Sequence, residues 1–198
     1  MPFNPDIHHR RSIRLKDYDY SSAGAYFVTL CVLNRECIFG EVTDGVIMLN
    51  HPGEIVQAEW LKSAEIRKEI ELDAFIVMPN HLHGIIVIDH ALPSVGATGG
   101  SPYGRSPQIN HIRQRAPGRS PRQPGPSPRS LGALVAGFKS ATTIRINEIR
   151  QNSGCPLWQR NYYERVIRDE RELERLRDYI TGNPAKWAED RENPVLHL

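Results

Sequence analysis

Two apolar segments on either side of a Pro-Asn pair constrain the fold of this chain more than any other feature. Residues 72–77 and 82–88 are rich in aliphatic and β-branched side chains, which favour strands. Pro79-Asn80 lies between them, and both residue types are typical of turns. The chain is therefore expected to form two strands that turn at Pro79-Asn80.

The second of these strands begins with two histidines one residue apart. Successive side chains of a strand point to opposite faces, so His81 and His83 share a face while Leu82 points the other way. Two neutral imidazoles on one face form two corners of a metal site that still lacks a third ligand. Histidines at a strand end can also simply cap exposed backbone, so the pair alone does not decide its role.

Other segments complete an irregular order of strands and helices. Further strands are expected over residues 25–32, 45–49 and 157–163. Helices are expected over residues 52–68, from Ser130 to at least Ile146, and over 169–181. This order does not suit a doubly wound parallel sheet. It predicts an α+β fold whose helices pack mainly on one face of an antiparallel sheet and leave the other face open for a site.

Residues 89–129 differ in composition from the rest of the chain. They hold eight prolines and six arginines, and Asp89 is their only acidic residue. Such a segment cannot bury enough apolar surface to offset the entropy lost on ordering. We therefore expect residues 89–129 to be a flexible, basic insertion within a single domain that spans residues 1–198.

Composition favours a cytoplasmic protein. No apolar run approaches the roughly 20 residues that span a bilayer, and the first six residues contain no apolar signal core. Cys31, Cys37 and Cys155 include no C-x-x-C pair, so they are expected to be reduced thiols. The formal net charge of +2 is too mild to indicate a nucleic-acid partner by itself, although clustered arginines favour one slightly.

The last predicted helix carries candidates for the missing partners of the histidines. Tyr179 and Asn183 are four residues apart, so they are neighbours on one flank if the helix persists to its final turn. The amide oxygen of Asn183 would complete a site for Mg²⁺ or Mn²⁺. Tyr179 would supply a phenolic nucleophile for a phosphodiester, and a divalent cation would help because the phenol pKa is near 10.

Plainer interpretations of the same residues stay open at this point. Tyr179 on its own is more often a rim aromatic, and Asn183 before Pro184 is an ordinary helix stop. A zinc hydrolase would use the same histidines. The sequence, however, has neither an H-E-x-x-H motif nor a third histidine at helical spacing.

The combined motifs resemble a known family. The chain is similar to the single-tyrosine HUH transposases of bacterial insertion sequences, and more closely to their REP-associated branch, the RAYT proteins. Besides His81-Leu82-His83 after Met-Pro-Asn and the Tyr179/Asn183 helix, the similarity includes residues 11–15, 24–29, 34–35, 137–140, 158–163 and 178–180. It covers nearly everything except residues 89–129.

The resemblance implies a ferredoxin-like α+β domain that acts on single-stranded DNA, often folded as hairpins. It assigns His81, His83 and Asn183 as ligands of Mg²⁺ or Mn²⁺. Tyr179 takes the place of the nucleophile, which forms a 5′-phosphotyrosine and leaves a free 3′-hydroxyl. Such a protein would nick and rejoin DNA as a monomer or a homodimer in the cytoplasm, associated with the nucleoid when bound to DNA.

Basic and aromatic residues outside the motif are the candidates for contacts with DNA. Unpaired bases can stack on aromatic rings while arginines follow the backbone, and Tyr162 and Tyr163 are expected to pack or to stack on bases. The candidates for hairpin contact are Arg10, Arg11, Arg14, Lys16, Arg160, Arg165 and Arg168. Two other functions remain open: a non-catalytic module that binds structured DNA or RNA, and a metal-dependent nuclease that uses water in place of Tyr179.

Overall fold

The computed structural model of the protein describes residues 18–90 and 126–194. A four-stranded antiparallel sheet has the order β4-β5-β1-β6, and a separate hairpin pairs β2 with β3. The strands are β1 (Gly24–Cys31), β2 (Gly40–Thr43), β3 (Val46–Leu49), β4 (Ile70–Met78), β5 (His81–Ile88) and β6 (Tyr163–Ile167). The helices are α1 (His51–Ile66), α2 (Leu131–Arg150) and α3 (Glu170–Thr181), with short 3₁₀ turns at Leu33–Arg35 and Pro184–Glu189.

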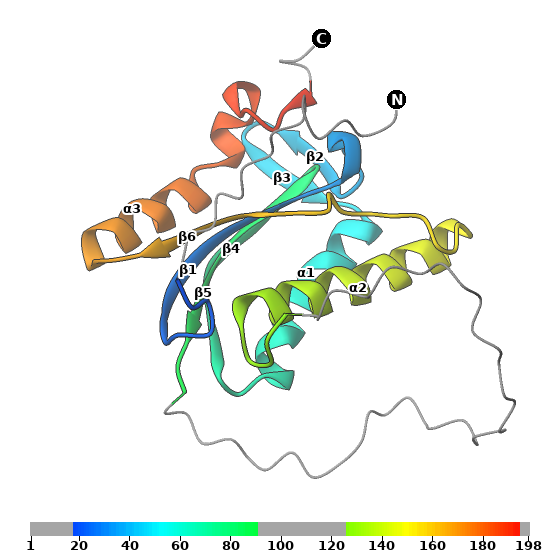
Figure 1. Ribbon diagram of the computed structural model, residues 1–198. Coiled ribbons are helices and arrows are strands. Elements are labelled where there is room, and N and C mark those ends of the chain that lie inside the picture. Colours follow the sequence, from blue (N-terminus) through cyan, green and yellow to red (C-terminus); the bar gives the residue numbers. More distant parts are fainter. Residues whose placement is uncertain (1–17, 91–125, 195–198) are drawn as a thin grey trace, which may run out of the picture.

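The helices cover the two faces of the sheet unequally. Helices α1 and α2 pack together on one face, whereas α3 lies on the other (Figure 1). Leaving the β2–β3 hairpin aside, the order β1-α1-β4-β5-α2-β6 and its sheet order match the ferredoxin-like arrangement. The predicted α+β fold with helices mainly on one face is confirmed.

Alternation along β1 and β5 separates a large core from a small one. Tyr26, Val28 and Leu30 of β1 point toward α1 and α2 and join the large core with Leu82 and Ile86 of β5. The residues between them face α3, where Phe27, Ile85 and Ile180 form a smaller cluster. His81 and His83 have the same parity as Ile85, so the histidines lie on the α3 face.

The prediction of a strand over residues 157–163 is wrong, because β6 begins only at Tyr163. Trp158 makes a single isolated bridge to Val32, and its buried indole N–H donates to Oγ1 of Thr142 at 2.8 Å. The ammonium group of Lys139 donates to the carbonyl oxygens of Gln159 and Asn161. The two Lys139 bonds take up backbone carbonyl oxygens that a strand ladder would otherwise use.

Other expectations are met with small shifts of the boundaries. The segment predicted over residues 45–49 is one half of the β2–β3 hairpin, whose first strand the sequence did not reveal. The three cysteines are free thiols. Most of the proposed insertion lies outside the described residues, so it and the single-domain organisation stay predictions. None of the helices in the described ranges has the length and apolar character that crossing a bilayer requires.

Gly84 allows the histidine strand to pack closely on α1. A Cβ atom built at Gly84 would lie 2.5 Å from Cζ2 of Trp60, a fully buried ring. We expect Gly84→Ala to lower the free energy of unfolding by about 1–3 kcal/mol, measured by chemical denaturation. An added methyl group in a tightly packed core forces the neighbouring side chains and backbone to move. Gly137→Ala is the control, since its nearest neighbour is the end of the Arg67 side chain at 3.5 Å. Equal denaturation midpoints for Gly84→Ala and the wild type would contradict this account.

Candidate active site

The two histidines stand side by side at the start of β5, in the middle of the sheet. Cys31 and Thr29 of β1 pair with His81 and His83 on one side, and Met78 and Ile76 of β4 pair with them on the other. Both imidazoles are buried. Their Nε2 atoms lie 3.0 Å apart, so both nitrogens can approach one ligand. The structure thus places the predicted histidine pair on one face as expected.

Asn80 determines which nitrogen of His81 carries the proton. The Asn80 amide nitrogen donates to the carbonyl oxygens of Arg35 and Glu192 at 3.0 and 2.7 Å. This leaves its Oδ1 facing Nδ1 of His81 at 2.8 Å. Because an amide oxygen only accepts, Nδ1 of His81 must be the protonated nitrogen, and Nε2 presents a lone pair. The sequence predicted a turn at Asn80 but not this orienting role.

His83 is oriented by its neighbours on β1. Its Nδ1 lies 2.8 Å from Oγ1 of Thr29, and the ring of Phe27 stacks on the imidazole with centroids 5.5 Å apart. Burial lowers the pKa of His81 to about 3 and also lowers the pKa of His83 well below its ordinary value. Both imidazoles are therefore neutral near pH 7, which is the form that binds metal ions.

Helix α3 brings Tyr179 to the histidines. The side chain of Asp169 caps the helix by accepting from the N–H of Glu172 at 2.8 Å. Arg177 makes two hydrogen bonds to the carboxylate of Asp73 on β4, at 2.9 and 2.6 Å. Together with the buried Ile180, these contacts set the position of the helix. The Tyr179 hydroxyl lies 3.2 Å from Nε2 of His83.

The environment of Tyr179 disfavours ionisation of its phenol. Burial raises its pKa most, and the negative charges of Asp190 and Glu192 raise it further. The phenol is thus protonated near neutral pH and is a weak nucleophile on its own. The ring is nevertheless accessible, because 45% of the residue's surface is exposed.

Asp190 lies next to the histidines and Asn183 contacts Asp190, although only Asn183 was predicted from the sequence. Asn183 follows α3 and is almost fully buried. Its Nδ2 donates to Oδ2 of Asp190 at 2.9 Å, while its Oδ1 has no hydrogen-bond partner within the described residues. One carboxylate oxygen of Asp190 and one nitrogen each of His81 and His83 all lie within 4.8 Å of one another.

The segment after α3 places Asp190 by folding back over the sheet. The ring of Trp187 lies 6.0 Å from that of His81, and the Asn80 amide donates a hydrogen bond to the Glu192 carbonyl oxygen. No spacing rule links a residue beyond an Asn-Pro helix stop to a strand about a hundred positions earlier, so sequence reasoning missed Asp190. The only signal was the chemical type of the carboxylate.

His81, His83 and Asp190 form a donor set that suits a divalent cation. One nitrogen of each neutral imidazole and one carboxylate oxygen of Asp190 converge at the same point, and Asn183 donates a hydrogen bond to that carboxylate. Imidazole and oxygen ligands in this combination bind metals such as Mn²⁺. The set suits a divalent metal ion, with an oxygen of Asp190 as the third ligand atom that converges with the two imidazoles.

A groove of about 1350 Å³ opens over the site. His83, Tyr179, Lys139, Arg160 and Tyr163 are among its lining residues. Burial lowers the pKa of Lys139 to about 8. The ammonium group of Lys139 lies over the Tyr162 ring, 5.6 Å from its centroid. Tyr162 also packs against the large core, and packing was one of the two roles expected of it.

The predicted DNA-contacting residues fall into three places. Arg160 is exposed in the groove. Arg165 and Arg168, on β6 and just after it, line a second cavity instead. Arg10, Arg11, Arg14 and Lys16 lie outside the described residues.

Comparison of the sequence with known proteins identifies one extensive match. No family model matches the chain. An uncharacterized protein of Haemophilus influenzae is 38% identical over 189 residues, which is 95% of each chain. The chain belongs to the family of this Haemophilus protein. Shared family membership at this level implies a common fold and does not in itself assign an activity.

Comparison with solved structures identifies a related fold. The structure of a REP-associated tyrosine transposase bound to a REP hairpin is similar over 90% of this chain and 77% of that one, with a TM-score of 0.53 and 17% identity. The protein therefore has a transposase-like fold, as the sequence resemblance led us to expect.

Proposed function

We propose that this protein is a single-stranded DNA transposase or strand transferase of the RAYT type. It would nick and rejoin hairpin-bearing DNA through a covalent phosphotyrosine. The observation that carries the proposal is the 3.2 Å distance between the Tyr179 hydroxyl and Nε2 of His83, beside the second imidazole of the pair. A nucleophile and a metal-binding pair from different parts of the chain meet at one point in a groove. The transposase-like fold supports the same activity.

Tyr179 would attack the phosphorus of a phosphodiester. Its oxygen forms the new bond to phosphorus while the bond to the 3′-oxygen breaks, and the phenol proton is released as the 3′-oxygen becomes a hydroxyl. The product is a 5′-phosphotyrosine and a free 3′-hydroxyl. Attack by a 3′-hydroxyl on this linkage reverses the step, so strands can be rejoined without an external energy source.

A divalent cation, Mg²⁺ or Mn²⁺, would be held by His81 and His83 with Asp190 or Asn183. When bound, it would neutralise charge on the scissile phosphate and offset the weakness of a protonated phenol. Asn80 and Thr29 would keep the two imidazoles oriented, as their hydrogen bonds indicate. The small apolar cluster under α3 would hold Tyr179 at the required distance.

The proposal predicts a covalent protein–DNA adduct. The protein should be mixed with a panel of hairpin-bearing single-stranded oligonucleotides and Mg²⁺ or Mn²⁺, and denaturing gels should show a shifted band that chelator prevents. Digestion and mass spectrometry should then locate a nucleotide on the peptide that contains Tyr179. Cleaved DNA without attached protein would instead indicate a nuclease that uses water. Hairpin binding that chelator leaves unchanged, with no cleavage, would indicate a non-catalytic DNA- or RNA-binding protein.

A further inference from the structure

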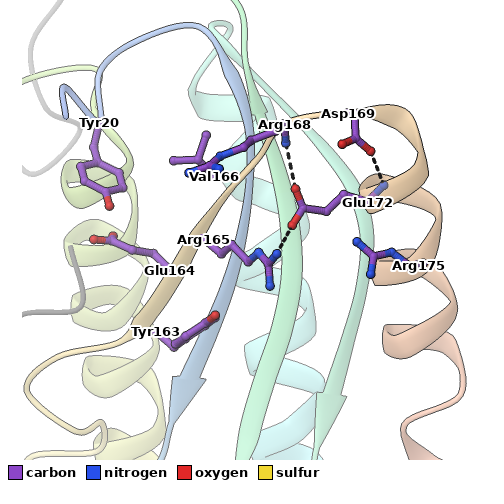
Figure 2. Close-up of a pocket in the computed structure, with 9 residues that line it drawn as sticks. All are labelled: Tyr20, Tyr163, Glu164, Arg165, Val166, Arg168, Asp169, Glu172 and Arg175. Carbon is purple, nitrogen blue, oxygen red and sulfur yellow. Dashed lines mark hydrogen bonds and ion pairs between the residues drawn. The ribbon is translucent and has the colours of Figure 1, made fainter. Parts of the chain in front are cut away.

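A second cavity of about 600 Å³ opens at the outer edge of β6. Because β6 is the last strand of the four-stranded sheet, this edge has no neighbouring strand within the described residues. Figure 2 shows Tyr20 on one side of β6 and Arg165, Glu172 and Arg175 on the other, with Arg168 at the end of the strand. The cavity is distinct from the groove over the histidines, and none of the candidate metal ligands lines it.

The acidic residues near the start of α3 are engaged in structural contacts. The buried carboxylate of Glu172 forms an ion pair with Arg165 and accepts from the backbone N–H of Arg168 at 3.1 Å. Asp169 caps the helix, as described above. Arg168 and Arg175 are exposed at the cavity (Figure 2). Glu164 also lines the cavity, but its buried side chain points toward Tyr20 (Figure 2), so the exposed charges at the cavity include the guanidinium groups of Arg168 and Arg175, which suit a phosphodiester.

Tyr163 connects this cavity to the groove that contains Tyr179. It lines both, and 43% of its surface is exposed. Its ring lies 6.2 Å from the ring of Phe27, which in turn lies 6.1 Å from that of Tyr179. The buried ring of Phe27 thus packs between Tyr163 at the cavity and the proposed nucleophile. Because Tyr163 and Tyr179 both line the groove, a single strand seated at Tyr179 could continue along it to Tyr163 and the cavity.

We propose that the cavity binds a nucleotide of single-stranded DNA next to the phosphate that Tyr179 attacks. Its base would stack on Tyr163, and its backbone phosphate would contact Arg168 and Arg175. Stacking on a single ring tolerates every base, so the subsite would strengthen binding without reading sequence. The position of this nucleotide relative to the cleaved bond rests on the proposed function, whereas binding of single-stranded DNA at the cavity does not.

The first test is binding of poly-dT oligonucleotides of graded length, measured by fluorescence anisotropy on the full chain with Tyr179→Phe. Adding Tyr163→Ala should weaken binding at least about 5-fold, the lower end for loss of one stacked base. Adding Tyr163→Phe should restore it, because the ring is kept. Arg168→Glu should weaken binding more than the same charge change at the exposed Arg150 at the end of α2. The inference is wrong if Tyr163→Ala binds like its parent and Arg168→Glu binds like Arg150→Glu.

The second test places the nucleotide relative to cleavage. On an oligonucleotide that forms an adduct, abasic sites are introduced one at a time on both sides of the cleaved bond. One flanking position should slow adduct formation, and Tyr163→Ala should be insensitive to an abasic site there. A flat scan in the presence of adduct would overturn the subsite and leave the proposed function intact. If no oligonucleotide forms an adduct, the proposed function fails, and the poly-dT comparison alone decides whether the cavity binds DNA.

Discussion

Tyr179→Phe is expected to abolish covalent attachment to DNA. The change removes one oxygen atom, which is the atom that would bond to phosphorus, and retains the ring and its contact with Phe27. We expect adduct formation to fall by at least about a thousandfold, to the detection limit, because a phenyl ring has no nucleophilic atom. Single-turnover assays on denaturing gels would measure the loss.

The same variant should remain folded and bind DNA normally. The Tyr179 ring is partly exposed, so loss of its hydroxyl should change stability little. Tyr18→Phe is a matched control, because the Tyr18 hydroxyl contacts that of Tyr26 on the opposite face of the sheet, at 3.3 Å. Adduct that persists in Tyr179→Phe would place the nucleophile elsewhere. Cleavage without adduct in both the variant and the wild type would make water the nucleophile.

The sequence predicted the parts of the site that follow local rules. The alternation of side chains along a strand was enough to place His81 and His83 on one face. The apolar stripe of the last helix predicted α3, and Asp169 at its start is the kind of residue that caps a helix. That Tyr179 faces the histidines did not follow from spacing alone, and the family resemblance supplied that expectation.

Contacts between distant segments were beyond the reach of sequence patterns. Asn80 orients His81 through carbonyl groups at Arg35 and Glu192, and no periodicity relates these positions. The strand predicted at residues 157–163 was displaced because Trp158 turns into the core to reach Thr142. Both cases are tertiary hydrogen bonds that override local propensity.

Asp190 was likewise beyond the reach of sequence patterns, and its proposed role as a metal ligand leads to the second large effect. Asp190→Ala is expected to weaken Mn²⁺ binding by at least about 10-fold, measured by isothermal titration calorimetry. Removing a residue that only hydrogen-bonds to a metal ligand already weakens metal binding by about 10-fold or more. Asp190 would itself be an anionic ligand, so its loss should cost at least as much. Glu189→Ala removes the same charge from the preceding, exposed residue and should bind Mn²⁺ like the wild type.

Asn183→Ala separates the two candidates for the third ligand. If Asp190 binds the metal, Asn183 acts mainly through the hydrogen bond that its Nδ2 donates to that carboxylate, and its loss should cost less than Asp190→Ala. If the unpartnered Oδ1 of Asn183 binds the metal, the order of the two effects reverses. We expect Asp190→Ala to have the larger effect, because a carboxylate brings both an oxygen and a negative charge to a cation beside two neutral imidazoles.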